Sequence, residues 1–179
     1  LIKPIFHDKD LIAFSATTSH VPDIGGRLRA IESRQVFEEG LQIPMMKLIR
    51  SGQVDETLVA LIRQNVRTPD QTIGDIWAQI GANEIMAKGL LVMLADYQLT
   101  ELNGFADELF KRTEKAMRSA IQALPDGKYE YGFETDGGAT PYVFRITLTI
   151  AKDEIIADFA GTSPTQTRAI NCVYAYTYA

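Results

Sequence analysis

The sequence predicts an α+β fold: N-terminal strands and a loop come first, a central antiparallel helix pair follows, and C-terminal antiparallel strands come last. Two changes in apolar spacing support this prediction. Short apolar runs give way near residue 54 to helical spacing, and the alternation typical of strands returns after residue 127. The chain has 179 residues, 46% of them hydrophobic, which is the size of one ordinary domain. We therefore expect a single domain or a fragment of a larger subunit.

The first part of the chain predicts a hairpin followed by a loop. Residues 2–6 and 11–16 are apolar runs joined by a polar turn, a pattern that favours two paired strands. Residues 17–29 contain Pro22 and two adjacent glycines, which makes a continuous helix improbable there. Residues 34–40 are expected to form a short helical turn that ends at a glycine.

The middle of the chain predicts three helices. Apolar residues share one face from residue 54 until Pro69 ends the first helix, because the residue before proline is pushed out of the helical region. Asp70 is the expected N-cap of a second helix, and a third is expected over about residues 101–124. The apolar stripes of the two long helices predict that they pack as an antiparallel pair.

The last third of the chain predicts an antiparallel sheet. Aromatic residues alternate with polar ones over residues 129–133. Two further apolar runs, residues 142–150 and 154–159, flank a tight connection, so they are expected to pair as neighbouring strands.

Charge and cysteine content exclude several classes of protein. With 18 basic and 23 acidic residues the net charge is −5 and no block of like charge occurs, which argues against binding to nucleic acid or to an anionic membrane. No apolar run approaches the length of a membrane helix, so we expect a soluble, cytoplasmic protein. The single cysteine, Cys172, can form no internal disulfide and is expected to be a buried thiol.

The loop after the first hairpin contains the residues most suited to chemistry. His20 and Asp23 stand three residues apart, and a neutral imidazole and a carboxylate can both turn toward one divalent ion. The same spacing also suits a loop histidine hydrogen-bonded to an aspartate that caps its own turn, and two ligands are too few for a metal site. Gly25 and Gly26 could bring backbone close to a ligand or only supply positive φ angles in a turn.

Several common catalytic motifs do not occur. The sequence has neither G-x-x-x-x-G-K-[ST] nor a G-x-G-x-x-G that follows a strand, so it predicts no nucleotide site of its own. Ser163 does not lie in a nucleophile elbow, and no histidine follows His20 to activate it. Serine catalysis within these residues is therefore not expected.

Six segments, in order along the chain, resemble the B-type subunits of the hydantoinase B/oxoprolinase family. They begin with Ser-His-Val-Pro-Asp-Ile-Gly-Gly at 19–26 and Val-Phe-Glu-Glu-Gly-Leu-Gln-Ile-Pro at 36–44. The later segments are Asn-Val-Arg-Thr-Pro at 65–69, the Gly-Asp, Ala-Gln and Ala-Asn pairs within 74–83, Ala-Leu-Pro-Asp-Gly at 123–127, and Asp-Phe-Ala-Gly-Thr-Ser-Pro at 158–164. Members of this family are much longer, so the resemblance implies an internal fragment.

The resemblance implies an ATP-dependent enzyme that works as a complex. In such enzymes a hydantoinase A-type partner uses ATP to phosphorylate an amide or enol oxygen, and the B-type subunit completes the reaction. Hydrolysis of a cyclic amide, as by N-methylhydantoinase or 5-oxoprolinase, is the favoured activity. A subunit of a ketone carboxylase, acting on acetone or acetophenone, and a non-catalytic assembly segment remain alternatives. A hetero-oligomer is expected, and the isolated fragment should be inactive.

The resemblance also bears on metal binding. In the related acetone carboxylase an H-x-x-D pair, matched here by His20 and Asp23, ligates the metal together with an upstream acid and a downstream histidine. The downstream histidine has no counterpart, and Gln42 or Met45 occupies its neighbourhood. A divalent ion, Mn, Zn or Mg, is implied at His20 and Asp23. On that view Asp23→Ala should abolish metal binding and turnover in the complete complex.

Overall fold

The computed structural model of the chain describes residues 1–28, 30–137 and 140–178. These residues form two compact units: unit 1 comprises Leu1–Glu101 and Gln166–Ala179, and unit 2 comprises Leu102–Thr165. The strands are β1 (Ile2–His7), β2 (Asp10–Ala16), β3 (Ile49–Arg50), β4 (Gln53–Val54), β5 (Gly127–Thr135), β6 (Tyr142–Ala151) and β7 (Glu154–Asp158). The helices are α1 (Glu56–Asn65), α2 (Pro69–Asp96), α3 (Asn103–Gln122) and α4 (Tyr174–Tyr178), with 3-10 turns η1 (Ala30–Glu32) and η2 (Val36–Glu38). The predicted α+β order of strands, helices and strands is confirmed.

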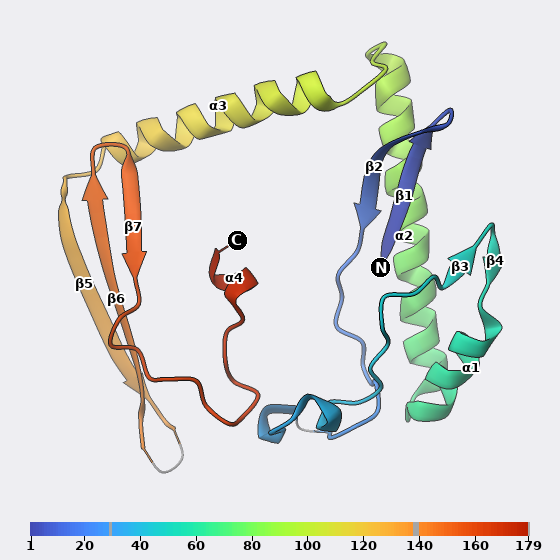
Figure 1. Cartoon of the computed structure of the whole chain (residues 1–179), viewed down its shortest axis with the longest axis horizontal. Helices are drawn as coiled ribbons and strands as arrows, with labels where there is room; N and C mark the ends of the chain where they lie inside the picture. The colour runs from blue at the N-terminus through green and yellow to red at the C-terminus, as the bar shows by residue number, and fades with distance from the viewer. Residues whose placement is uncertain (29, 138–139, 179) are drawn as a thin grey trace. The chain divides into compact units, whose positions relative to one another are not determined.

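Unit 1 begins with the predicted hairpin, in which β1 and β2 pair antiparallel and lie along α2 (Figure 1). The buried residue Asn83 of α2 holds the base of this hairpin. Its side-chain amide donates to the carbonyl of Leu1 and to Oγ1 of Thr17 at 3.2 Å, and its backbone carbonyl accepts from Ser15 Oγ at 3.1 Å. These bonds set where the chain leaves β2, and therefore where the following loop starts.

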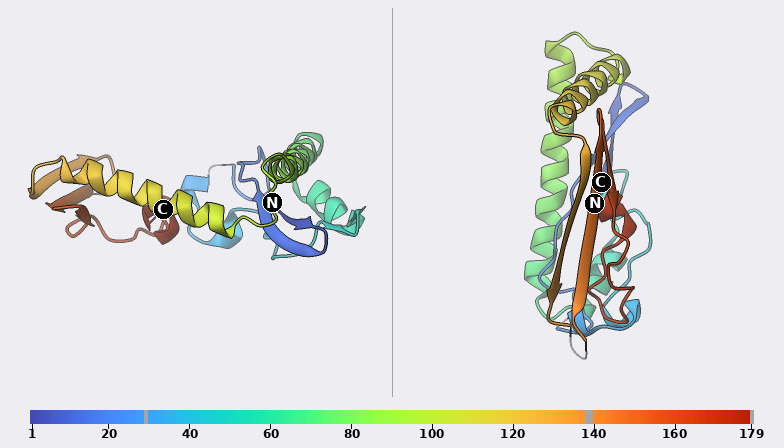
Figure 2. Two further views of the ribbon diagram at one scale, coloured as in Figure 1. Left: turned by 90° about the horizontal axis from the view of Figure 1, so that it is seen from above. Right: turned by 90° about the vertical axis from the view of Figure 1, so that its left-hand side faces the viewer.

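The core of unit 1 lies between α1 and the first turns of α2, which are neighbours (Figure 2). Leu58, Ile62, Val66 and Ile73 form a buried apolar cluster. Asp55 caps α1 by accepting from the backbone N–H of Leu58 at 3.0 Å. Burial of Val66 fixes the turn between the two helices, so the residues on either side of it have a defined position.

The N-cap prediction for the second helix is wrong. The N-cap is Thr68, Pro69 is the first helical residue, and Asp70 lies in the first turn. Proline suits the first helical position because its missing N–H would have no partner there. Asp70 instead forms an ion pair with Arg63 at 2.9 Å across the turn.

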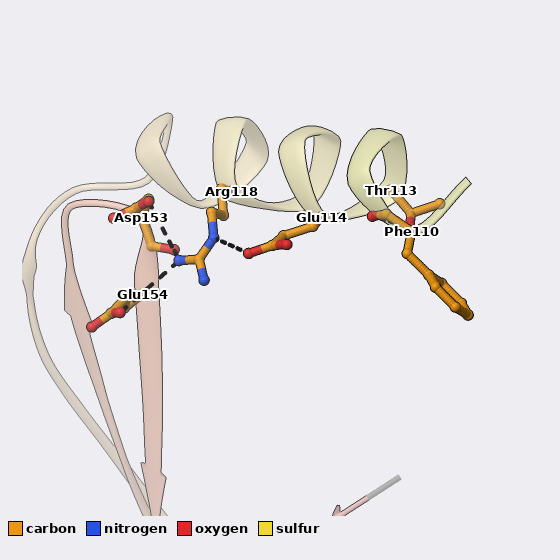
Figure 3. A network of polar contacts seen from close by, with 6 residues as sticks. All are labelled: Phe110, Thr113, Glu114, Arg118, Asp153 and Glu154. Atoms are coloured by element: carbon orange, nitrogen blue, oxygen red, sulfur yellow. Dashed lines mark hydrogen bonds and ion pairs between the residues drawn. The ribbon is translucent and has the colours of Figure 1, made fainter. Parts of the chain in front are cut away.

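Unit 2 consists of α3 and the three-stranded antiparallel sheet β5-β6-β7, which confirms the predicted C-terminal strands. Arg118 connects the helix to the sheet (Figure 3). Its guanidinium lies 2.9 Å from Glu114, 3.4 Å from Asp153 and 4.0 Å from Glu154. Hydrogen bonding and charge attraction, from Glu114 first and then Asp153, raise the pKa of Arg118 above its ordinary value. The predicted pairing of α2 with α3 stays a prediction, because the two helices belong to different units.

Three further findings concern Cys172, the short β3–β4 hairpin and the apolar character of the helices. Cys172 is exposed, so its predicted burial is wrong. The two-residue strands β3 and β4 form a hairpin that was not predicted from the sequence, with positive φ angles at Ser51 and Gly52 in its turn. Among the described residues, no helix has the combined length and apolar character that crossing a membrane requires.

The α1–α2 core makes a testable prediction about stability. Ile62 is 2% exposed, and the adjacent Leu61 in the same helix is 51% exposed. Comparing an alanine variant at each position therefore distinguishes the effect of burial from the effect of a substitution in this helix. Ile62→Ala should lower the free energy of unfolding by about 2–5 kcal/mol, because it removes apolar contacts and leaves a cavity. Leu61→Ala should change it by less than about 0.5 kcal/mol. Urea unfolding followed by Trp77 fluorescence measures both, and equal losses would contradict the assigned core.

Candidate functional site

The loop that contains His20 and Asp23 packs against the segment that follows η2. The backbone N–H of Arg27 donates to the carbonyl of Glu38 at 2.9 Å, and the N–H of Leu41 donates to the carbonyl of Ile24 at 2.8 Å. These two bonds join the segments on both sides of a glycine-rich contact. The loop therefore has a defined conformation although it contains no strand or helix between residues 17 and 28.

Three glycines allow this contact. Gly25, Gly26 and Gly40 have φ angles of +83°, +67° and +127°, a region that side chains other than hydrogen disfavour. A Cβ atom on Gly26 would lie 2.5 Å from the carbonyl oxygen of Glu38, and one on Gly40 would lie 2.3 Å from that of Ile24. The positive φ angles expected at Gly25 and Gly26 are confirmed, and close backbone approach is a second reason for glycine there.

Asp23 is the polar centre of the loop. Its Oδ1 accepts from the N–H of Gly25 at 2.9 Å and from Nη1 of Arg67 at 2.9 Å, and its Oδ2 accepts from the backbone N–H of Arg67. The side chain is only 10% exposed. The backbone N–H of Arg67, then that of Gly25 and the Arg67 guanidinium hold the pKa of the Asp23 carboxyl below its ordinary value, against the opposing effect of burial.

The turn between α1 and α2 supplies the groups that hold the loop. Arg67 lies directly after the buried Val66, and its Nη2 also donates to the carbonyl of Gly26 at 2.5 Å. Thr72, fully buried in the first turns of α2, donates its hydroxyl to the carbonyl of Asp23 at 3.1 Å. The packed helical core thus positions a loop more than 40 residues earlier in the sequence.

His20 lies outside this network. Its side chain is exposed, and its backbone carbonyl accepts from the hydroxyl of Ser19 at 3.0 Å. Within the described ranges, no hydrogen bond joins His20 to Asp23. Asp23 does cap its own turn, as one interpretation of the sequence expected, but its side-chain partner is Arg67.

The donor set does not fit a divalent ion as it is arranged here. A carboxylate oxygen has two lone pairs, and both on Oδ1 of Asp23 already accept N–H donors, one of them from a positively charged group. Across the part of the chain that the structure describes, no three His, Cys, Asp or Glu side chains group closely enough to hold a metal. Metal binding by His20 and Asp23 stays a prediction.

A pocket of about 400 Å³ opens beside the loop that Arg67 holds. Its volume falls within the range of small-molecule sites, about 300–1,000 Å³. The walls combine glycine backbone, two carboxamide side chains and two apolar side chains. The lining residues are Gly25, Gly26, Phe37, Gly40, Leu41, Gln42 and Asn65. Gly25 and Gly26, which the sequence offered as candidates for a substrate loop with backbone close to a ligand, therefore lie on a pocket wall. The mixed lining suits a small neutral ligand with polar edges.

The residues that complete this site were not predicted from the sequence. Arg67 and Asn65 stand in the Asn-Val-Arg-Thr-Pro segment, where no site residue was expected. The available signal was an arginine two residues before Pro69, in the expected break between two helices, where a side chain can reach another segment. Thr72 offered no signal, because its spacing is that of an ordinary helix residue.

The fold and site define a class of protein: an α+β segment in which the loop containing Gly25 and Gly26, held by the turn between α1 and α2, borders a pocket. The sequence profile of the Hydantoinase B/oxoprolinase family matches residues 1–179. The chain belongs to this family.

Curated relatives and solved structures agree with this assignment. The chain is 32% identical over 172 residues to a protein of Pseudomonas sp. NS671 provisionally named as the B component of a D-/L-hydantoinase, a match that covers 90% of this chain and 29% of that protein. It is 30% identical over 132 residues to the beta component of caprolactamase from Pseudomonas jessenii, covering 72% of this chain and 23% of that one. The chain thus spans less than a third of the length of these relatives.

Two solved structures share the fold. ATP-dependent caprolactamase from Pseudomonas jessenii matches with a TM-score of 0.82 and 27% identity, covering 95% of this chain and 30% of that one. An acetone carboxylase structure matches with a TM-score of 0.75 and 19% identity, covering 90% of this chain and 24% of that one. At that identity the second likeness shows the fold alone.

The glycine contact predicts a difference between two alanine substitutions. Gly26 and Gly52 both have positive φ angles, but Cβ on Gly26 would overlap the backbone of residues 38–40, whereas Gly52 has open space around it. Gly52→Ala should cost about 1–2 kcal/mol for the left-handed backbone alone. Gly26→Ala should cost more and should raise amide hydrogen exchange in residues 36–42. Thermal unfolding and exchange mass spectrometry measure these effects, and identical behaviour of the two variants would refute the close approach.

Proposed function

We propose that this chain is part of the B-type subunit of an ATP-dependent enzyme that hydrolyses a cyclic amide together with an A-type partner in the cytoplasm. The main support is family membership across the whole chain combined with likeness to a caprolactamase in both sequence and fold. The hydantoinase and 5-oxoprolinase names of other relatives point to the same class of substrate.

The proposed reaction needs ATP because resonance makes an amide carbonyl a poor electrophile. The A-type partner transfers the γ-phosphoryl group to the amide oxygen and releases ADP. Water then adds to the activated carbon, the ring C–N bond breaks with protonation of nitrogen, and a second water displaces phosphate from the resulting acyl phosphate. The products are the open amino acid, ADP and phosphate.

The pocket of unit 1 is the part of this chain best suited to receive the substrate. Gln42 offers an amide donor and acceptor that match the edge of a lactam, and Phe37 offers an apolar face for its ring. Asn65 adds a carboxamide oxygen, while its Nδ2 already donates to the carbonyl of Leu61 at 2.8 Å. Positioning a bound ring against the activating partner and water lowers the entropic part of the barrier. No catalytic step in this proposal passes through a metal ion.

Ketone carboxylation is the second candidate activity. Its support is the likeness to acetone carboxylase, which at 19% identity concerns the fold. Hydrolysis is preferred because caprolactamase is similar in sequence as well as in fold, and because Gln42 or Met45 stands where the carboxylase pattern led us to expect a histidine.

Turnover by the full-length subunit copurified with its A-type partner tests the proposal. We expect ADP release and ring opening on at least one of 5-oxoproline, hydantoins and caprolactam, with none when ATP or the partner is omitted. Ring opening is followed by mass spectrometry and ADP by a coupled assay. ATP-dependent incorporation of labelled bicarbonate into acetone, without ring opening, would favour the carboxylase instead.

Truncation of the pocket residue Phe37 tests whether this chain binds substrate or serves only in assembly. Phe37 is exposed and lines the pocket, whereas the exposed Tyr97 follows α2 and is not among the lining residues. Phe37→Ala should raise KM for the cyclic amide about tenfold, equivalent to about 1.4 kcal/mol of binding, with unfolding unchanged. Tyr97→Ala should leave KM unchanged. If neither variant alters KM, Phe37 does not contact the substrate, which would favour the assembly role.

A further inference from the structure

The contact between Asp23 and Arg67 joins two segments that are 44 residues apart. Arg67 makes three contacts with the glycine loop: its backbone N–H and Nη1 donate to the two carboxylate oxygens of Asp23, and its Nη2 donates to the carbonyl of Gly26. A guanidinium is planar and presents its N–H groups in a fixed fork, so one side chain can hold both acceptors at once. A lysine, with one compact ammonium group, cannot reproduce this geometry.

We call the three contacts that Arg67 makes with Asp23 and Gly26 the clamp. The clamp lies next to the pocket. Gly26, one of its acceptors, lines the pocket, and so does Asn65, two residues before Arg67. The Asp23 side chain is almost covered, and Thr72 holds the carbonyl of the same residue from the first turns of α2. Release of the clamp would free the loop on the pocket side while the helical core stays packed.

The same contacts disfavour direct metal ligation by Asp23. Of its carboxylate oxygens, Oδ1 accepts two donors and Oδ2 accepts one, so a cation bound to Asp23 would have to lie close to the Arg67 guanidinium, whose Nη1 is 2.9 Å from Oδ1. Two positive groups beside the same carboxylate repel each other in a partly buried site. Metal binding at Asp23 and the clamp are therefore competing arrangements.

We propose that Asp23 is a positioning residue that acts through Arg67 to fix the glycine loop at the pocket, and that it is not a metal ligand. The link to substrate binding rests on the proposed function of the pocket. The clamp and the absence of metal ligation do not, so they can be tested whether or not a substrate is known.

The test uses Asp23→Asn, Arg67→Met, Arg67→Lys and the double variant Asp23→Asn with Arg67→Met in the full-length subunit with its partner. Arg63→Met is the matched control, since Arg63 pairs with Asp70 at the same turn but does not contact the loop. Elemental analysis gives the metal content of each variant, and exchange mass spectrometry gives the hydrogen exchange of residues 19–42. KM and kcat are measured on the cyclic amide that the wild type turns over.

For the clamp, we expect Asp23→Asn and Arg67→Met to raise exchange in the loop equally, with the double variant no worse than either. Arg67→Lys should restore only part of the protection, and Arg63→Met should behave as wild type. Metal content should be the same in all variants, whether or not the wild type contains metal. KM should rise at least about tenfold in the clamp variants, with kcat changed less.

Two results would overturn the proposal. Loss of bound metal in Asp23→Asn but not in Arg67→Met would identify Asp23 as a metal ligand. Loop exchange that is unchanged in both single variants would show that the clamp does not hold the loop. If no cyclic amide is turned over by the wild type, the proposed function fails, while the exchange and metal measurements still decide the role of Asp23.

Discussion

The turn between α1 and α2 is the constraint on which the candidate site depends. Burial of Val66 in the apolar cluster fixes this turn, and Arg67 beside it carries the fixed geometry to Asp23 and Gly26. A loop without regular secondary structure leaves polar groups that it does not pair by itself, and here the helix turn supplies partners for Asp23 and Gly26. The apolar core thereby determines the position of a polar pocket wall, although no buried residue of the cluster is among those that line the pocket.

Periodicity was sufficient to predict most elements of the fold. The hairpin, the helices and the C-terminal strands each repeat an apolar pattern over several residues, and each lies where the pattern placed it. Single-residue features were harder. Asp70 has the chemistry of an N-cap. Pro69, however, suits the first helical position, so the residue before it, Thr68, is the N-cap. Cys172 stands among apolar residues in the sequence, and neighbours in sequence do not determine whether a short terminal segment is covered.

The loop beside the pocket could be singled out from the sequence, but its contacts could not. The glycine pair and the His20–Asp23 spacing drew attention to this loop, because unusual backbone requirements are visible in the residue type. The partner of Asp23 was not visible, because an ion pair across 44 residues depends on how two helices pack. The spacing of His20 and Asp23 suggested that they act together. Folding turns one of them to Arg67 and leaves the other exposed.

Unit 2 shows the same division between local pattern and long-range contact. The apolar stripe of α3 predicted a helix, yet no residue of α3 is buried, so an amphipathic pattern placed the element without identifying what covers it. A polar contact joins α3 to the sheet: Arg118 reaches Asp153, 35 residues later, in the turn between β6 and β7. In both units an arginine on or beside a helix connects to an aspartate that periodicity could not have paired with it. Apolar spacing therefore specifies the elements of this fold, and charged side chains at their ends specify how loops and turns are held against them.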